Sequence, residues 1–167
     1  VNILIDHKEI KNKIFIIENF YYLMIILVTF VLDRYSKAEI IKNLNDKSLY
    51  INDYLNLDLT WNTGVGFGLF SSSSELYYNI VSLIISIVIL LVFFLIIKSK
   101  RFDKIAFSII LGGALGNFYD RIFFNAVPDF IDFHYNNFHW FTFNFADIFI
   151  SMGVILYLSK NLIFKNE

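Results

Sequence analysis

An apolar run without a single charge, from Tyr77 to Ile97, limits the folds open to this chain. A helix needs about 20 apolar residues to cross the hydrocarbon core of a bilayer, so this run is long enough to span a membrane. The 167-residue chain is 57% apolar and 17% charged, whereas soluble domains are roughly 45–50% apolar and about 25% charged. Buried core helices of a soluble protein would need more polar surface than remains, so we expect one integral membrane domain.

Three further apolar segments carry charges towards their ends. Glu18 lies near the start of the first, and Asp147 and Lys160 lie near the two ends of the last. No small-residue cleavage site follows the first segment, so we interpret it as a retained helix and not as a removed signal peptide. We therefore expect four transmembrane helices, at about residues 14–34, 77–97, 105–121 and 141–163.

Basic residues set the expected orientation. The loop between the second and third helices contains Lys98, Lys100, Arg101 and Lys104. Short loops rich in Lys and Arg stay in the cytoplasm. Lysines also precede the first helix and follow the last, whereas the stretch at about 122–139 has neither Lys nor Arg. We therefore expect both termini in the cytoplasm and the connections at about 38–76 and 122–139 outside.

The longest connection, at about 38–76, is expected to form a small subdomain. It begins with a candidate surface helix at Ala38–Leu44, and Leu49–Tyr54 and Leu57–Trp61 alternate enough to be short strands. Three glycines follow within Gly64–Gly68, which favours tight turns. The predicted fold is thus membrane all-α, with four transmembrane helices and a small extracytoplasmic β-sheet or loop subdomain between the first and second helices.

Carboxylates gather at those helix ends that we place outside. The five candidates are Asp33, Asp120, Asp129, Asp132 and Asp147. Ionisable groups in or beside membrane segments are costly and usually mark function. Two carboxylates held close together share one proton, so that one acts as a base towards water and the other as an acid. The pattern is typical of an aspartyl peptidase.

Other chemistries find little support in the sequence. Cysteine is absent, which excludes disulfides, a thiol nucleophile and cysteine-bound metal. His7, His134 and His139 form no HExxH motif, so we expect no metal, no cofactor and no effect of chelators. His134 and His139 lie in an aromatic stretch and are expected at the surface. The formal net charge of −1 indicates no nucleic-acid partner.

Several of these residues also have simpler interpretations. Asp33 and Lys37 stand four residues apart and could form an ordinary pair on a helix surface. Gly112 and Gly116 have the spacing of a helix-packing face, which is the interpretation we keep. The asparagines near the helix ends could satisfy neighbouring backbone groups, and the two tryptophans could be ordinary interfacial anchors.

Five motifs, taken together and in order, resemble those of the lipoprotein signal peptidase, or signal peptidase II, family. They are Asp33–Lys37, Asn62–Phe67, Gly112–Arg121, Val127–Phe130 and Phe143–Asp147. Each is weak alone, but five in order on a four-helix topology form a specific pattern that covers most of the chain. One departure is Gly66, where the family often has alanine.

The resemblance implies an enzyme that cleaves diacylglyceryl-modified prolipoproteins just before the lipidated cysteine and releases the signal peptide. It implies a place in the bacterial cytoplasmic (inner) membrane with the active site at the outer face, where we expect a monomer among membrane lipids. The family's catalytic pair corresponds to Asp129 and Asp147. Its supporting polar residues correspond to Asp33, Lys37, Asn62, Gly64, Asn117, Asp120, Arg121 and Asn144.

Asp120 is the rival for the first catalytic position, since it also lies at an outer helix end. We favour Asp129 because Asp120 has Arg121 beside it and is expected to form an ion pair with it. The asparagines and Arg121 would position the substrate backbone and orient the acids. The segment Gly64–Gly68 would form part of a lid, since glycine permits close approach and movement.

Two other classes of protein remain as alternatives. A small carrier or channel-like protein would need polar residues across the membrane, whereas here they cluster at one face and the run at 77–97 has no charge. An intramembrane aspartyl protease of another family would hold both acids deep in its helices. Asp129 lies instead in a loop-like stretch beside Pro128.

Overall fold

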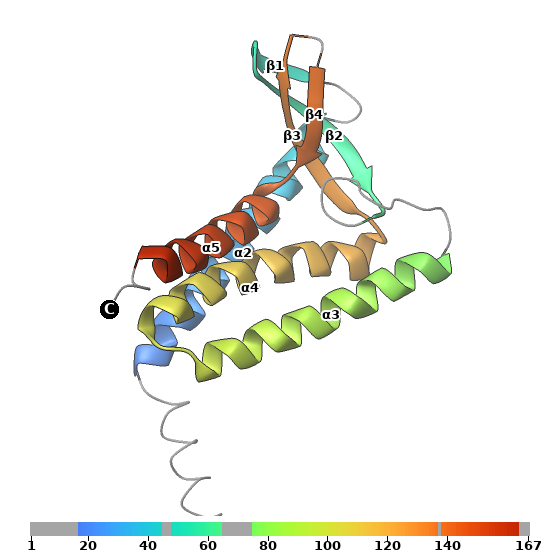
Figure 1. Cartoon of the computed structure of the whole chain (residues 1–167). Coiled ribbons are helices and arrows are strands. Elements are labelled where there is room, and N and C mark those ends of the chain that lie inside the picture. The colour runs from blue at the N-terminus through green and yellow to red at the C-terminus, as the bar shows by residue number, and fades with distance from the viewer. Residues whose placement is uncertain (1–16, 45–47, 65–74, 137, 164–167) are drawn as a thin grey trace, which may run out of the picture.

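The computed structural model describes residues 17–44, 48–64, 75–136 and 138–163. Its helices are α2 (Ile17–Leu44), α3 (Glu75–Lys98), α4 (Arg101–Phe124) and α5 (Phe145–Ile163). Its strands are β1 (Leu49–Asn52), β2 (Leu55–Asn62), β3 (Val127–Tyr135) and β4 (Phe138–Phe143). The described chain thus combines four helices with a small antiparallel sheet, and the strands project from one end of the helices (Figure 1).

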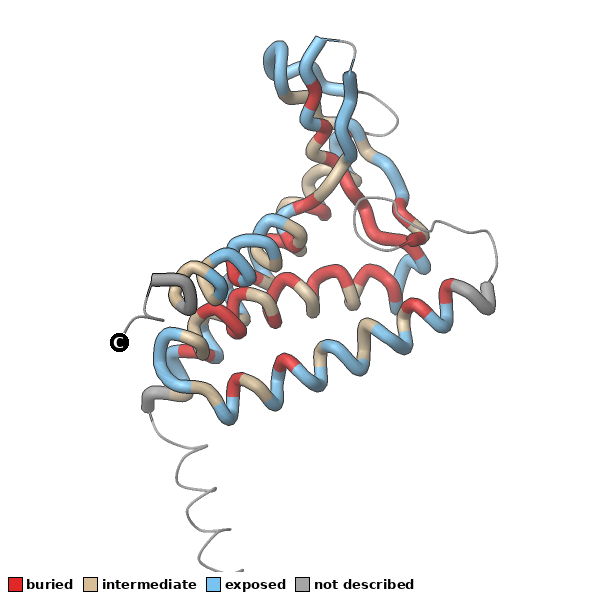
Figure 2. The backbone as a smooth tube through the Cα atoms, in the orientation of Figure 1, coloured by how far each residue is buried: buried red, intermediate tan, exposed pale blue. Residues whose placement is uncertain are grey.

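Helix α4 is the centre of the helical part, because α2, α3 and α5 all pack against it. Figure 2 shows buried residues along most of its length. Phe107 and Leu111 of α4 form an apolar cluster with Val92 and Ile96 of α3. The helix ends where Asn125 adopts a left-handed conformation with φ 54°, a common way to end a helix. It therefore extends past residue 121, where we predicted its end.

The glycines of α4 let neighbouring helices approach closely, which confirms the predicted packing face. Gly112 lies against Thr29 of α2, and Gly116 lies against Asp33 of the same helix. On another side of α4, a Cβ atom added to Gly113 would lie 2.6 Å from the backbone oxygen of Ala146 in α5. Side chains at these positions would push α2 or α5 away from the central helix.

The outer faces of the helices are strongly apolar. Within the described residues, one helix, Tyr78–Lys98, is long and apolar enough by length and composition to cross a membrane. It is mostly unburied, with only 11% of its most apolar window buried in the protein. Large apolar side chains are also exposed along α2 and α5, among them Val28, Val31 and Ile155. Such a surface is favourable against lipid and costly in water.

The four strands form one sheet in the order β1-β2-β3-β4, with every neighbouring pair antiparallel. The expected strands at Leu49–Tyr54 and Leu57–Trp61 are confirmed as β1 and β2. Strands β3 and β4 come from the connection between α4 and α5, which we expected to be a loop and the start of a helix. A two-stranded ribbon alone is only marginally stable, so the second hairpin completes the sheet.

Three expectations about these elements were therefore wrong. The sheet is not confined to the connection between the first two helices, since half of it follows α4. The last helix does not begin near residue 141, because Phe138–Phe143 is β4 and α5 starts at Phe145. No separate surface helix forms at Ala38–Leu44, because no proline or glycine interrupts the chain there and α2 continues to Leu44.

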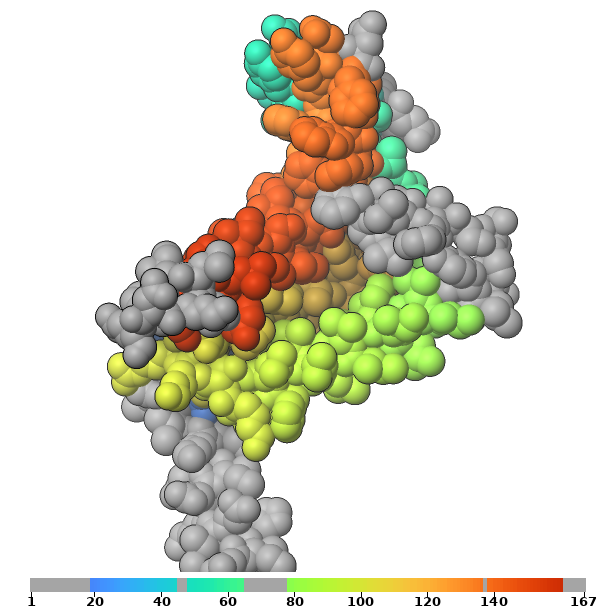
Figure 3. Space-filling model, viewed as in Figure 1, coloured from blue at the N-terminus to red at the C-terminus, as the bar shows by residue number. Residues whose placement is uncertain are grey.

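The bundle of helices has a polar end beside the strands and a basic end opposite them. Helix α2 ends, and α5 begins, beside the strands, whereas the turn between α3 and α4 lies at the opposite end (Figure 1). Lys98 and Arg101 border that turn, and nearby Lys160 pairs with Asp103 at 2.7 Å. In the space-filling view the strands rise above the helices as a separate projection (Figure 3). Chemistry at the strand end is therefore distant from the basic turn.

Candidate active site

Asp129 occupies the third position of β3 and is buried, with 2% of its surface exposed. Two amide groups donate hydrogen bonds to its carboxylate. Asn62 at the end of β2 donates to Oδ2 at 2.9 Å, and Asn144 before α5 donates to Oδ1 at 2.5 Å. Asp129 thus lies on a strand and not in the loop we expected. The hydrogen bonds of the sheet hold its backbone in place.

Asp147 lies in the first turn of α5 and forms a capping arrangement with Asn144. The Asn144 side chain accepts a hydrogen bond from the Asp147 backbone N–H at 3.1 Å. In return, Asp147 Oδ2 accepts one from the Asn144 backbone N–H at 3.2 Å. Reciprocal bonds of this kind satisfy backbone donors that a helix N-terminus leaves free. The start of α5 therefore fixes Asp147 and places Asn144 between the two carboxylates.

Asn117 of α4 connects Asp147 to a buried lysine. Its Nδ2 donates to Asp147 Oδ1 at 2.9 Å, while its Oδ1 accepts from Lys37 Nζ at 2.7 Å. Because Lys37 can only donate, the orientation of the Asn117 amide is determined. The amide nitrogen must then face Asp147. The side chain of Asn117 thus links Lys37 of α2 to the Asp147 carboxylate of α5.

Lys37 is fully buried and uses all three of its donors. Besides Asn117 it donates to Asp33 at 2.8 Å and to Asp120 at 2.8 Å. Asp33 is fully buried as well, and its other oxygen accepts a hydrogen bond from the backbone N–H of Ala146 at 2.9 Å. The Asp33–Lys37 pair is therefore not the exposed helix pair we considered. It links α2 to α4 and to the first turn of α5.

The partner expected for Asp120 was wrong. Asp120 is fully buried and pairs with Lys37 and with Arg34 of α2, not with the neighbouring Arg121. Consecutive residues of a helix point in different directions, so adjacency in sequence does not bring these two together. The conclusion drawn from that pairing, that Asp120 is engaged in ion pairs, nevertheless agrees with the structure.

Arg121 of α4 supports the site through hydrogen bonds to backbone oxygens. Its guanidinium donates to the backbone oxygen of Asn117 at 3.1 Å and to that of Gly64 at 2.9 Å. The Gly64 N–H in turn donates to the Asn62 side chain at 2.8 Å, so these bonds hold the end of β2 against α4. The Arg121 Nε atom is buried without a hydrogen-bond partner among the described residues. Of the glycine-rich segment expected to form a lid, Gly64 alone is described.

The surroundings of Asp129 favour its protonated form. Burial raises the pKa of Asp129 from 3.8 to about 6, and the negative charge of Asp147 adds to that rise. The hydrogen bonds from the two asparagines act in the opposite direction but are outweighed. A carboxyl that keeps its proton up to about pH 6, close to a second carboxylate, suits general acid and base chemistry.

A cavity of about 510 Å³ opens beside Asp129 and is lined by residues of β2, β3 and β4. Asn62, Asp129 and other polar residues form part of its wall, while Trp61, Trp140 and Phe141 contribute aromatic rings. Asp132 and His139 line the same cavity. The space is large enough for an extended segment with both polar and apolar parts.

All ten residues selected from the sequence as catalytic or supporting belong to one connected set of side chains and backbone groups at the strand end. Arg34 was not selected, although it pairs with Asp120 and stacks on Tyr119 with its guanidinium carbon 4.5 Å from the ring centroid. Its spacing from Lys37, three residues along one helix face, is a signal that could have indicated it.

Asp132 and the two nearby histidines lie outside this set. His134 is buried and not at the surface as expected, because it points from β3 towards Asp132. His139 of β4 is exposed, as expected, and its Nδ1 lies 2.8 Å from Asp132. The sequence does not show that Asp132 and these histidines meet, because the β3–β4 pairing that joins them is decided by the fold.

Comparison with known proteins agrees with this arrangement. A family model described as signal peptidase (SPase) II matches residues 25–163. A lipoprotein signal peptidase from Pelagibacter ubique is 46% identical over 160 residues, which cover 93% of this chain and 96% of that protein. A lipoprotein signal peptidase from Francisella tularensis subsp. novicida is 42% identical over 125 residues, which cover 72% of this chain and 78% of that protein.

Two solved structures of a bacterial membrane enzyme, determined by the in meso method at 2.3 Å and 1.9 Å resolution, have a similar fold. They give TM-scores of 0.72 and 0.70 at 28% sequence identity. The similarity covers 85% of this chain and 87% and 92% of the two solved chains. The overall fold is therefore similar to that of experimentally determined membrane enzymes.

Proposed function

This chain belongs to the signal peptidase II family and is a membrane peptidase that removes signal peptides from prolipoproteins; we propose that Asp129 and Asp147 carry out the hydrolysis. The observation that supports this pair is the hydrogen bonding of Asn144. Its side chain donates to the Asp129 carboxylate, and it exchanges reciprocal side-chain-to-backbone hydrogen bonds with Asp147. The two acids come from a strand and a helix and lie 18 residues apart in sequence. Both make hydrogen bonds with Asn144, and Asp129 also lines the cavity.

The proposed reaction needs one proton shared between the two acids. The ionised carboxylate removes a proton from a water molecule, whose oxygen attacks the carbonyl carbon of the scissile peptide bond. The protonated carboxyl then gives its proton to the amide nitrogen as the carbon–nitrogen bond breaks. The raised pKa of Asp129 supports a shared proton, because it disfavours two negative charges side by side.

The supporting residues keep this pair in position. Lys37, Asp33 and Asn117 tie the first turn of α5 to α2 and α4, and we propose that they orient Asp147. Asn62 and Arg121 hold the end of β2 beside Asp129. Asp120 stays engaged with Lys37 and Arg34 and contributes structure, not proton transfer.

The cavity suits a substrate that is a lipid-anchored peptide. Its aromatic wall, with Trp61, Trp140 and Phe141, would contact apolar groups, while the wall near Asp129 would contact the peptide backbone. Cleavage just before a diacylglyceryl-modified cysteine places such a bond at the membrane surface. We propose that the cavity holds the residues next to that cysteine.

The membrane topology we propose has four transmembrane helices, both termini in the cytoplasm and the active site at the outer face. The exposed apolar side chains of α2 and α5 support spans besides α3. Lys98 and Arg101 lie at the end of the helices opposite the strands, which fits a cytoplasmic turn. Enzyme and substrate then meet within one bilayer, and we propose that the chain acts as a monomer.

Cleavage of a lipidated substrate tests the catalytic pair. The purified protein in detergent is mixed with a diacylglyceryl-modified prolipoprotein, and the mobility shift is followed on a gel. We expect Asp129→Asn and Asp147→Asn to lower the rate by at least about 10³-fold, because each removes one of the two proton-transfer groups. Asp53→Asn, which changes an exposed carboxylate in the β1–β2 turn, serves as the matched control.

Near-normal cleavage by either catalytic variant would contradict the pair. Cleavage that survives Asp129→Asn but is lost in a folded Asp120→Asn would move the catalytic role to Asp120. A folded parent protein that leaves a confirmed lipidated substrate uncut would favour the alternative of a non-enzymatic carrier. The clustering of the polar residues at one end of the helices argues against that alternative.

A further inference from the structure

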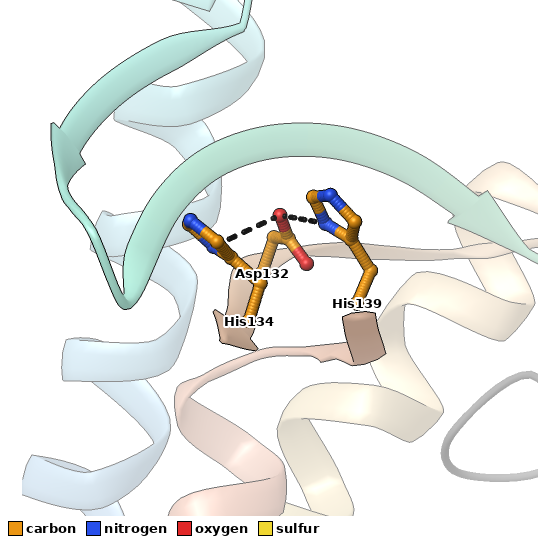
Figure 4. Close-up of side chains that lie close together, drawn as sticks. All are labelled: Asp132, His134 and His139. Carbon is orange, nitrogen blue, oxygen red and sulfur yellow. Dashed lines mark hydrogen bonds and ion pairs between the residues drawn. The ribbon is translucent and has the colours of Figure 1, made fainter. Parts of the chain in front are cut away.

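Asp132, His134 and His139 face one another on the β3–β4 hairpin, away from the network that holds Asp129 and Asp147. Figure 4 shows the Asp132 carboxylate between the two imidazole rings. One ligand atom from each residue lies within 4.8 Å of the others. Asp132 and His134 are two apart on β3 and share a face, and His139 is the cross-strand partner of His134. The sheet therefore brings together two imidazoles and one carboxylate.

The distances are close to those of a tetrahedral zinc site. Zinc binds histidine nitrogen and carboxylate oxygen at about 2.0–2.2 Å, which separates neighbouring ligand atoms by about 3.4 Å. Here the Asp132 Oδ2 atom lies 2.8 Å from His139 Nδ1 and 3.6 Å from His134 Nδ1. These two distances bracket the required one, so shifts of less than an ångström would admit an ion. The two rings are nearly parallel, with centroids 5.0 Å apart.

His134 gives a second and independent indication of a ligand. Its side chain is 9% exposed, and its Nδ1 atom has no hydrogen-bond partner among the described residues. At 3.6 Å the Asp132 oxygen is too distant for a hydrogen bond. A buried polar atom without a partner is costly and calls for an explanation. A cation held between Asp132 and His134 would satisfy it.

Asn56 of β2 adds to this environment from the neighbouring strand. Its Nδ2 lies 3.4 Å from Asp132 Oδ2, and its Oδ1 is buried without a partner in the described part of the chain. Rotation of this amide by half a turn would present the oxygen towards the carboxylate and any cation beside it. Imidazole and carboxylate ligands suit zinc and related divalent metals. The exposed His139 leaves a path for entry from solvent.

We propose that Asp132, His134 and His139 form a binding site for a divalent metal ion of the zinc class. The ion would join β3 to β4, and it would fix the wall of the substrate cavity that Asp132 and His139 share with Asp129. Its role is to stabilise the hairpin, and it takes no part in hydrolysis. The sequence had indicated no metal because the three ligands form no recognised motif. The proposal does not depend on the catalytic pair.

Direct binding measurements test the site. The full chain, purified with a tag that contains no histidine and stripped with a chelator, is titrated with Zn²⁺ by calorimetry. We expect one equivalent to bind in the micromolar range or tighter and to raise the midpoint of thermal unfolding by several degrees. Cobalt(II) offered instead should give the visible absorption bands of a low-symmetry site.

Substitutions then assign the ligands. His139→Asn changes an exposed residue and should fold, and we expect it to weaken zinc binding at least about tenfold and to remove the stabilisation. Asp132→Asn should do the same. His7→Asn removes the one histidine of the chain that is not a proposed ligand and should bind zinc as the parent does.

Two results would overturn the proposal. One is the absence of zinc binding or stabilisation at about 100 μM zinc, and the other is binding that survives both substitutions. A third outcome concerns its separation from catalysis. Stripped protein that keeps its unfolding midpoint and its substrate affinity but loses cleavage, and regains it with zinc, would show that the ion acts in hydrolysis, which would contradict its separation from the catalytic pair.

Discussion

At the scale of single residues, the site depends on side chains that each make hydrogen bonds with two partners. Asn144 caps α5 and donates to Asp129, and Asn117 joins Lys37 to Asp147. Each amide is oriented by the partner on one side and so presents a defined atom to the other. Uncharged side chains thereby set the geometry of the two acids.

The raised pKa of Asp129 predicts a pH dependence of stability. The folded protein keeps this proton up to about pH 6, whereas the unfolded chain, with its pKa near 3.8, releases it earlier. Between these values the folded state binds more protons, so stability falls as pH rises, by up to about 3 kcal/mol above pH 6. In Asp129→Asn this loss should disappear.

The measurement is the midpoint of thermal unfolding in detergent from pH 4 to pH 8. We expect the parent to lose stability relative to Asp129→Asn as pH rises, while Asp53→Asn follows the parent. Parallel curves for the parent and Asp129→Asn would mean that burial does not disfavour the ionised carboxylate.

At the scale of elements, the two proposed catalytic acids lie where a strand and a helix begin. Asp129 is held by the pairing of β3 with β2, and Asp147 is held by the cap of α5. The close contacts at Gly113 and Gly116 let α5 and α2 approach α4 so that the polar groups can meet. Packing between helices therefore sets distances within the site.

Replacement of Asn144 should separate its role as a helix cap from its proposed role in orienting Asp129. Serine is also a good N-cap residue, so Asn144→Ser should unfold close to the parent temperature. Asn144→Ala loses the cap and should cost about 1 kcal/mol. Both variants remove the donor to Asp129 and should cleave at least about tenfold more slowly than the parent.

The comparison requires thermal unfolding and the gel assay on the same preparations. Ser48→Ala, just before β1 and outside the polar network described above, controls for a small substitution beside the sheet. Full cleavage by Asn144→Ser would show that the bond to Asp129 is dispensable and that Asn144 acts only as a cap.

At the scale of the whole molecule, apolar helices support a polar site at one end. The strand end holds the buried charges, and the opposite end holds the basic turn between α3 and α4. This asymmetry supports an orientation in the membrane, since basic loops remain in the cytoplasm.

Labelling of single cysteines tests that orientation, because the natural chain has no cysteine. Asp53→Cys in the sheet should react with a membrane-impermeant maleimide in right-side-out vesicles. Lys100→Cys in the α3–α4 turn should react only after the membrane is permeabilised. The reverse pattern would place the site in the cytoplasm, and equal labelling of both would contradict a fixed orientation.

Much of this molecule could be predicted from local patterns. Apolar runs, basic loops and the order of five short motifs indicated the helices, the first hairpin and the residues of the site. Helix formation and membrane insertion depend on neighbouring residues along the chain, so a sequence displays them directly.

What the tertiary structure decided concerns partners that are distant in the chain. Only the fold shows that β3 and β4 complete the sheet, that Asp120 pairs with Lys37 and Arg34, and that His134 is buried beside Asp132. Adjacent residues such as Asp120 and Arg121 can point apart, while residues 83 positions apart, such as Lys37 and Asp120, form a buried ion pair. The packing of α4 against its neighbours and the register of the strands decide these contacts. Both depend on residues that are distant in the chain, so no short stretch of the sequence predicts them.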